Sequence, residues 1–167
     1  ILQIADTQEG RKVSPDTLAL INAALDREEP DLVVYSGDQI WGRGFHGDVN
    51  QVRRVLKELT APVVERHLPF AICFGNHDRQ VGLDNRAQFE IYKEIPGFIG
   101  EDTPGVDGVG NCVLEIADGD RPGYLLYLID SHSSLKVGYD HVHQNQIDWY
   151  RGVRASASLT SNRRAPC

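Results

Sequence analysis

The sequence predicts an α/β fold whose parallel sheet is built from a strand–helix–strand–helix–strand unit. Short apolar segments at positions 1–5, 31–36 and 68–74 each end abruptly in polar residues. Between them lie two segments whose apolar residues recur at helical spacing. This order is typical of βαβ units, in which parallel strands are joined by right-handed helical crossovers. We therefore expect three neighbouring parallel strands with helices packed against the sheet.

The two helices of this unit have clear boundary signals. Ser14 stands at an N-cap position, Pro15 at the first helical position and Asp16 in the first turn, and Pro30 ends the segment. A second amphipathic helix is expected after a glycine-rich loop, with a kink at a proline inside it. Its apolar face is formed by Val52, Val55, Leu56, Leu59 and Val63, and the proline is Pro62.

The remainder of the chain predicts two helices and a hairpin. A helix is expected at 87–95 and ends at Pro96. Strands at 112–117 and 123–130 are joined by a segment typical of a hairpin turn, and the last helix begins near position 143. Trp149 and Tyr150 are expected to belong to the core beneath that last helix.

Composition narrows the possible partners and the compartment. The chain has 167 residues, enough for one domain or part of one, and a formal net charge of −7. This charge disfavours a nucleic-acid backbone as the main partner. Three widely spaced cysteines, Cys73, Cys112 and Cys167, indicate core and terminal thiols in a reducing, cytoplasmic compartment. No apolar run reaches bilayer length, and because Ile1 already lies on a strand, we expect further sequence upstream.

Polar clusters follow each of the first three strands. They occupy positions 6–8, 37–39 and 75–78. Parallel strands have their carboxyl ends at one edge of the sheet, where ligands bind. The residues expected to converge at this edge are Asp6, Asp38, Asn76 and His77.

These residue types favour a metal site. Carboxylate and amide oxygens are hard ligands for divalent ions, alone or together with imidazole. Gly37 and Gly75 let the backbone turn sharply after a strand, so that the next side chain points over the sheet edge. A single aspartate after a strand is usually a loop residue or a helix cap. Three such clusters on consecutive strands favour joint metal binding.

The motifs "ADTQ", "SGDQ" and "FGNHD" resemble those of the calcineurin-like metallophosphoesterase superfamily. The segments "YLIDSHSS" and "QNQIDWYRGV" are similar to its bacterial and fungal branch related to purple acid phosphatases. The resemblance implies a sandwich of two mixed β-sheets flanked by helices. It also implies a centre of two metal ions, of Mn, Fe or Zn, that hydrolyses a phosphate monoester or diester with an activated water.

The resemblance also assigns roles to the clustered residues. Asp6 would bind the first metal, Asp38 would bridge both metals and Asn76 would bind the second. His77 would stabilise the phosphate or protonate the leaving oxygen. Asp78 would orient His77 through its ring N–H. The substrate is not identified by any motif.

The chain departs from the family pattern at two positions of the first metal site. Gln8 stands where the family has a histidine. Trp41, which cannot ligate, stands where purple acid phosphatases have a tyrosine. Either the first metal site is weakened, or Gln8 coordinates directly or through a water.

The family's two histidine-bearing segments near the carboxyl end are also missing. The resemblance therefore implies that 1–167 is a partial calcineurin-like phosphoesterase domain, truncated at its carboxyl end, with up to three imidazole ligands outside it. An alternative is a non-catalytic binding domain that retains the fold. A nuclease of the same superfamily is disfavoured by the acidic balance and by the lack of Lys/Arg clusters near the motifs.

The remaining histidines and one further aspartate have simpler interpretations. Helix capping is expected for His67 and a solvated loop position for His46. His132 follows a strand end near the sheet edge, and His141 and His143 have metal-like spacing that is more typical of surface residues. Asp130 is expected to be structural.

Overall fold

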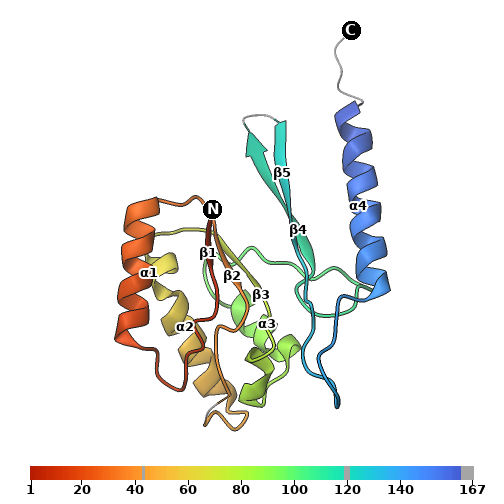
Figure 1. Cartoon of the computed structure of the whole chain (residues 1–167). Helices are drawn as coiled ribbons and strands as arrows, with labels where there is room; N and C mark the ends of the chain where they lie inside the picture. The colour runs from red at the N-terminus through yellow and green to blue at the C-terminus, as the bar shows by residue number, and fades with distance from the viewer. Residues whose placement is uncertain (43, 119–120, 163–167) are drawn as a thin grey trace.

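The computed structural model describes residues 1–42, 44–118 and 121–162. Its centre is a parallel sheet with strand order β1-β2-β3 (Figure 1). The strands are β1 (Leu2–Ile4), β2 (Val33–Ser36) and β3 (Phe70–Cys73). Leu2 pairs with Val33, and Val33 with Phe70. The predicted α/β class and its three parallel strands are confirmed.

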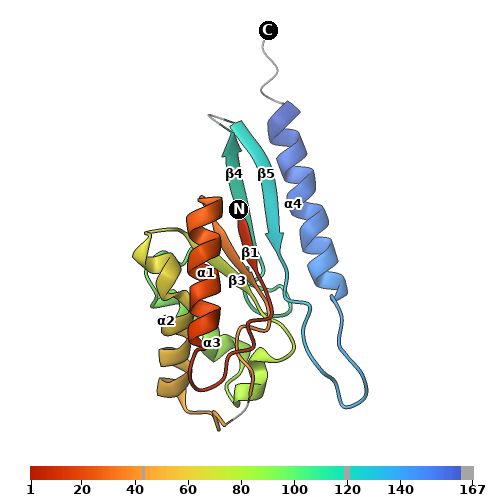
Figure 2. The same ribbon diagram turned by 60° about the vertical axis from the view of Figure 1, so that its left-hand side comes forward.

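Two helices form the crossovers between these strands. In α1 (Pro15–Glu28), the Ser14 hydroxyl accepts a hydrogen bond from the Asp16 backbone N–H at 3.2 Å, as the capping signal predicts. In α2 (Val49–Glu65), the Asp48 carboxylate caps the first turn, and the helix continues past Pro62. Both helices lie on the same side of the sheet in Figures 1 and 2.

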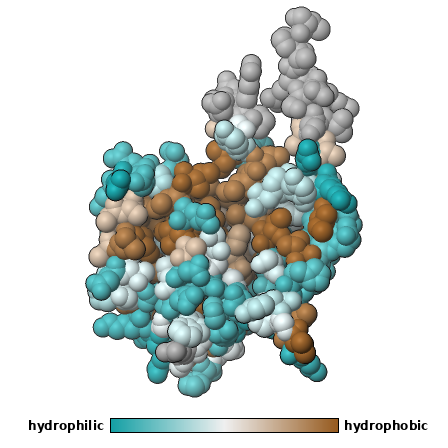
Figure 3. Space-filling model, in the orientation of Figure 1, coloured by the Kyte–Doolittle hydropathy of each residue, from teal (hydrophilic) through white to brown (hydrophobic). Residues whose placement is uncertain are grey.

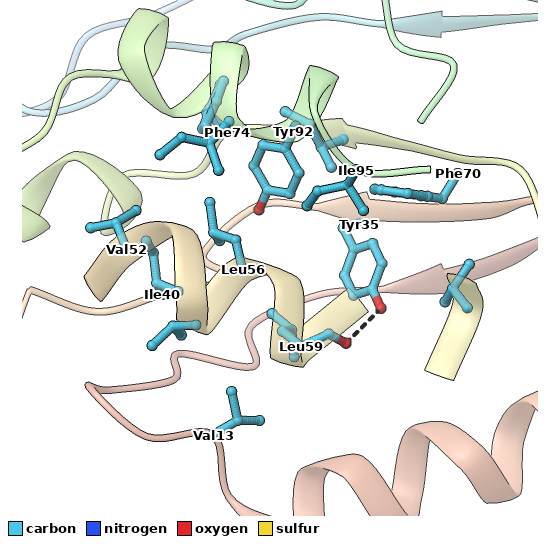
Figure 4. Close-up of a cluster of buried hydrophobic side chains, with 14 of the residues drawn as sticks. Val13, Tyr35, Ile40, Val52, Leu56, Leu59, Phe70, Phe74, Tyr92 and Ile95 are labelled. Atoms are coloured by element: carbon cyan, nitrogen blue, oxygen red, sulfur yellow. Dashed lines mark hydrogen bonds between the residues drawn. The ribbon is translucent and has the colours of Figure 1, made fainter. Parts of the chain in front are cut away.

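The main core lies between these helices and the sheet (Figure 4). Leu56 and Leu59 of α2 pack towards Tyr35 of β2 and Phe70 of β3, and all four side chains are fully buried. The Tyr35 hydroxyl donates to the Leu59 carbonyl at 3.2 Å, which satisfies its one donor inside the core. Each such buried side chain contributes about 1.5–3 kcal/mol relative to exposure, so this layer holds the strand ends in place.

A short 3₁₀ helix, η1 (Asp78–Val81), directly follows the strand-end motif of β3. The sequence did not predict it. The helix α3 (Asn85–Lys93) comes next and begins two residues earlier than expected, because the Asp84 carboxylate caps it by accepting the Ala87 N–H at 2.7 Å. The segment after α3 then runs beside β3, where the Phe70 N–H donates to the Gly97 carbonyl and the Ile99 N–H to the Phe70 carbonyl, both at 2.9 Å.

An antiparallel hairpin covers the opposite face of the parallel sheet. It consists of β4 (Cys112–Asp118) and β5 (Arg121–Leu128). Figure 2 shows it across the sheet from α1. A second apolar cluster fills this interface, and its buried members are Leu32, Val34, Ala71, Cys112 and Leu128. Cys73 and Cys112 are free thiols. The expected turn includes residues 119–120, which lie outside the described residues, as does Cys167.

The last helix, α4 (Gln144–Asn162), packs on β5 through aromatic contacts. The ring of Tyr127 lies 4.8 Å from that of Tyr150 and 6.1 Å from that of Trp149, centroid to centroid. Both α4 rings stay half-buried, whereas the sequence predicted core positions. The reason is that α4 contacts a two-stranded hairpin that does not cover it on all sides.

Hydrophobic residues also reach the surface near β1 and the hairpin (Figure 3). Ile1 is 62% exposed, Leu20 71% and Tyr124 77%. Within the described part of the chain, the outer side of β1 has no strand partner. No helix in the described part of the chain is both long and apolar enough to cross a membrane.

Candidate metal centre

Backbone hydrogen bonds bring the three polar clusters together at the carboxyl edge of the sheet. The Asp6 N–H donates to the Gly37 carbonyl at 3.1 Å, and the Gln8 N–H donates to the Asp38 carbonyl at 2.9 Å. The His77 N–H donates to Oδ1 of Asp38 at 2.7 Å. The clusters after β1, β2 and β3 therefore form one continuous site, as the strand order predicts.

The backbone of this site adopts a conformation that side chains rarely tolerate. Asp6, Gln8 and Asp38 have φ values of 56°, 45° and 54°, in the left-handed region. Such conformations are uncommon for non-glycine residues because they are strained, and they are found most often at functional sites. Three of them at one sheet edge mark this edge as a candidate functional site.

Glycines permit the close approach of the second and third clusters. A Cβ added to Gly75 would lie 2.2 Å from Oδ1 of Asp38, and one added to Gly37 would lie 3.0 Å from the Gly75 nitrogen. Gly37 also has a φ of +113°, which disfavours other residues. The expectation that these glycines shape the strand-end turns is confirmed.

The exposed fractions of the candidate ligands suit a bound cation. Asp38 is buried to 9% exposure, while Asp6 is exposed and Asn76 is half-buried. One Asp38 oxygen accepts the His77 N–H, and a buried carboxylate is stabilised further when it faces a positive charge. Gln8 turns its amide nitrogen towards Oδ1 of Asp6, at 3.4 Å. Its oxygen would have to rotate towards an ion in order to ligate it.

The predicted role of Asp78 in orienting the His77 ring is wrong. Its side chain is buried to 1% exposure and accepts three backbone N–H groups instead. Oδ2 accepts those of Asp38 at 2.9 Å and Gly75 at 2.7 Å, and Oδ1 accepts that of Ile40 at 3.1 Å. Asp78 therefore fastens the end of β2 to the end of β3.

Burial is the main influence on this carboxyl group. Desolvation raises the pKa of Asp78 to about 6, and the nearby Asp38 charge acts in the same direction. The three backbone N–H groups oppose this by favouring the charged form. The pKa of Asp78 thus reflects its position under the site rather than contact with solvent.

Gln80 makes the contact that the sequence assigned to Asp78. Its Oε1 lies 3.0 Å from Nδ1 of His77. Because an amide oxygen only accepts, this contact places the ring proton on Nδ1 and leaves the Nε2 lone pair free. The ring of Trp41 lies edge-on at 5.8 Å. The sequence did not predict this contact, because the side chains of His77 and Gln80 lie close together only when the chain forms the 3₁₀ turn.

A buried polar network lies beside this edge. The Gln146 amide nitrogen donates to Oδ1 of Asn111 at 3.0 Å and to the Asp130 carbonyl at 2.7 Å. The Asp130 carboxylate accepts the Val109 and His132 N–H groups, which matches its expected structural role. Sequence reasoning missed Asn111 and Gln146, because glutamine and asparagine carry no periodic signal.

The structure also places the remaining histidines. His46 is exposed, as expected for a solvated loop position. His67 is also exposed, but the C-cap of α2 is the preceding residue, Arg66, and not His67 as the sequence predicted. His132 and His143, which are distant in sequence, stack with ring centroids 4.1 Å apart. The loop that carries them reaches the strand-end site, where the Ser133 hydroxyl lies 3.5 Å from the Asn76 carbonyl.

A separate shallow groove lies at the other end of the sheet. It is lined by Ile1 and Leu2 of the β1 segment and by Leu20 of α1. Because these residues lie at the amino-terminal end of β1, the groove does not belong to the strand-end site.

Comparison with known proteins identifies the family. The profile of the calcineurin-like phosphoesterases matches residues 1–159. Phosphatase DCR2 of Saccharomyces cerevisiae is 33% identical over 83% of this chain, and an uncharacterized protein of Schizosaccharomyces pombe is 33% identical over 86%. A probable inactive purple acid phosphatase 14 of Arabidopsis thaliana is 27% identical over 90%.

The chain spans 28%, 26% and 45% of the lengths of the fission yeast, budding yeast and plant relatives. The profile nevertheless covers nearly the whole chain, including all three strand-end clusters. The parallel sheet with flanking helices agrees with the fold of that family. The chain belongs to the calcineurin-like phosphoesterase family.

Proposed function

We propose that this protein is a metal-dependent phosphoesterase that hydrolyses a phosphate monoester or diester at the carboxyl edge of the β1-β2-β3 sheet. The observation that carries the proposal is the 2.7 Å hydrogen bond from the His77 N–H to Oδ1 of Asp38. It joins the second and third clusters while Asp6 is bonded to the turn at Gly37. Hard oxygen ligands and an imidazole are thereby held in one place.

The residues present fit a metal centre. Asp6, Asp38 and Asn76 would hold two ions of Mn, Fe or Zn, with Asp38 between them and Gln8 as a further ligand of the first ion. The close packing of Asp38 against Gly75 supports a fixed position for the bridging carboxylate. The ions would supply charge stabilisation at phosphorus and make a water acidic enough to attack.

His77 is proposed to handle the proton of the leaving group. Gln80 holds Nδ1, so Nε2 is the atom that exchanges a proton with the substrate. The Trp41 ring packs edge-on against the imidazole and restricts its rotation. Because the Asp38 carboxylate accepts the His77 backbone N–H, the position of His77 depends on that of this proposed metal ligand.

We also propose that residues 1–167 are part of a larger catalytic domain. The chain spans about a quarter of the two yeast relatives, and the strand-end site offers mainly oxygen donors. Imidazole ligands from sequence beyond these residues would complete the centre. The free thiols of Cys73 and Cys112 support a reducing compartment, which we propose to be the cytoplasm.

The test is hydrolysis of an aryl phosphate monoester and an aryl phosphate diester with added Mn²⁺. Asp38→Asn is expected to lower turnover at least about 100-fold, because loss of the bridging charge removes several kcal/mol of transition-state stabilisation. Asp31→Asn, at an exposed position before β2, is the matched control and is expected to behave as the wild type. Equal, measurable turnover by the Asp38 variant and the wild type would refute the proposal.

A second candidate is a non-catalytic domain that retains the fold. Two observations favour it: Gln8 directs its amide nitrogen at Asp6, and several relatives are named as probable inactive purple acid phosphatases. Calorimetry with Mn²⁺ separates the candidates. Tight binding at two sites would contradict the non-catalytic alternative, whereas absence of both binding and turnover would support it.

Nucleic acid is the least favoured substrate. The net charge of −7 gives no general attraction to phosphate backbones. Binding to single-stranded DNA that fell steeply with rising salt would show otherwise.

A further inference from the structure

We propose that His132, Asp140 and His143 form a second, mononuclear site for a divalent transition-metal ion of the Zn²⁺ type. One ligand atom from each residue lies within 4.8 Å of the other two. None of the three belongs to the strand-end centre, so this proposal does not depend on the phosphoesterase activity. The site would lie at the base of the loop between β5 and α4.

The spacing of two donors already matches a shared ion. Nε2 of His143 lies 3.2 Å from Oδ1 of Asp140. Two ligands bound tetrahedrally, each about 2.0–2.1 Å from Zn²⁺, lie roughly 3.3 Å apart. Two imidazoles and one carboxylate form an established type of zinc set that leaves a fourth position for water. The distance between the two atoms of this pair therefore matches that between two ligands of one ion.

The two carboxylates that face His143 favour a positive charge in the cluster. Both nitrogens of His143 face carboxylates, because Nδ1 lies 2.8 Å from Oδ2 of Asp107. A neutral imidazole carries one N–H, so one of its two nitrogens must present a lone pair to a negative oxygen. Among the described residues, neither Asp107 nor Asp140 has a Lys or Arg in an ion pair. A protonated His143 would donate to both carboxylates, which raise its pKa. A divalent ion between Nε2 and Asp140 would also remove the repulsion, and it would balance both carboxylates.

Neighbouring groups set the tautomers in the way that metal binding requires. Oε1 of Gln146 lies 3.1 Å from Nε2 of His132 and also accepts the His143 backbone N–H at 2.7 Å. Since this oxygen only accepts, the His132 proton lies on Nε2 and Nδ1 is free to ligate. Asp107 fixes the His143 proton on Nδ1 in the same way. Hydrogen bonds of this kind orient histidine ligands in metal sites.

The stacked rings must open when an ion binds. Their planes are inclined by only 23°, and ring lone pairs lie in the ring plane. The rings therefore have to rotate for both lone pairs to point at one ion. The side chains of Asp140 and His143 are 19% and 34% exposed, which leaves access from solvent and room for this movement.

The ion would fix a loop with an apolar tip. Figures 1 and 2 show the segment between β5 and α4 projecting from the body and returning, and Figure 3 shows hydrophobic residues there. Leu135, Val137 and Tyr139 are 55%, 90% and 75% exposed. The base of the loop touches the strand-end site through Ser133 and Asn76. Closing the base with an ion would hold the tip beside that site.

The test is titration of the chain with Zn²⁺ by calorimetry, and with Co²⁺ by visible absorption, in the Asp38→Asn background. That background weakens the strand-end centre and leaves the cluster intact. One equivalent of Zn²⁺ is expected to bind, and Co²⁺ is expected to give the absorption of a tetrahedral site. His132→Asn is expected to weaken binding at least about tenfold. Asp107→Asn should weaken binding about 10- to 100-fold, as expected for a group that orients a ligand.

Matched controls separate ligation from misfolding. His132 has a φ of 67° and His46 a φ of 52°, and asparagine tolerates this left-handed region. His46→Asn is therefore the same change at an exposed loop position, and it should leave Zn²⁺ binding unchanged. If His132→Asn unfolds, Asp140→Asn serves instead, because its amide oxygen can still accept the His141 N–H.

Two results would overturn the proposal. One is unchanged Zn²⁺ affinity in the His132 and Asp140 variants, which would mean that the carboxylates hold a protonated His143 instead. The other is loss of all Zn²⁺ binding in Asp38→Asn alone, which would mean that the cluster is part of the strand-end centre.

Discussion

Two carboxylates that follow neighbouring strand ends, Asp38 after β2 and Asp78 after β3, serve different purposes here. Asp78 is enclosed, and both of its oxygens accept backbone N–H groups of β2 and β3 turns. Asp38 accepts the His77 N–H with one oxygen only and is less completely buried, at 9% exposure. The motif alone could not distinguish these roles, because both residues follow a glycine-containing turn. The difference arises from the 3₁₀ turn that directs Asp78 inwards.

Replacing Asp78 with Asn is expected to lower the free energy of unfolding by about 2–4 kcal/mol. The amide presents an N–H₂ group to backbone N–H donors, which leaves buried donors without an acceptor. Urea denaturation followed by circular dichroism measures the change. Asp148→Asn, on the exposed side of α4, is the control and should alter stability by less than about 0.5 kcal/mol. Equal stabilities of the two variants would contradict the role assigned to Asp78.

Replacing Gly75 with Ala is expected to displace the Asp38 carboxylate. The added Cβ would lie 2.2 Å from Oδ1 of Asp38 and 2.5 Å from its backbone nitrogen. Overpacking of this kind costs about 1–3 kcal/mol, and Mn²⁺ affinity should fall with it. Gly152 in α4 has open space around it, so Gly152→Ala is expected to be neutral or stabilising. Unchanged Mn²⁺ binding in Gly75→Ala would show that Asp38 does not need its present position.

At the scale of secondary structure, apolar periodicity and capping residues predicted every long element. The start of α1 was predicted from Ser14, which hydrogen bonds to the first turn. The start of α3 was expected two residues too late, because the cap formed by Asp84 was not recognised. The cluster of His132 and His143 could not be predicted, since it depends on how a loop returns between β5 and α4. That return is fixed by Gln146, whose side chain is buried to 0% exposure.

Replacing Gln146 with Ala is expected to loosen the start of α4 and the end of β5. The change removes the partners of the Asp130 carbonyl and of the His143 N–H, at a cost of about 2–3 kcal/mol. Hydrogen exchange should accelerate at 128–146, while β1, β2 and β3 keep their protection. Gln144→Ala is the control, because the Gln144 side chain is exposed and donates to the Asp148 carboxylate one turn along the same helix. Uniform acceleration over both sheets would contradict a local role.

For the whole molecule, function follows from the topology of one sheet. Three parallel strands deliver three polar clusters to one edge, helices cover one face of the sheet and the hairpin covers the other. This arrangement was predictable, because the spacing of the apolar residues indicates the order of strands and helices. Several contacts that give the polar residues their roles were not, because they join distant positions: Asp38 bonds to His77 and to Asp78, 39 and 40 residues away.

The most direct test of this account is calorimetric titration with Mn²⁺, a hard ion that favours the oxygen ligands of the strand ends over the imidazole cluster. Wild type and Asp31→Asn are expected to bind Mn²⁺ with the same affinity. Asp38→Asn is expected to bind at least about tenfold more weakly, because the buried carboxylate at the centre of the site has lost its charge. Binding of Mn²⁺ by Asp38→Asn as tightly as by the wild type would contradict a metal centre at this sheet edge.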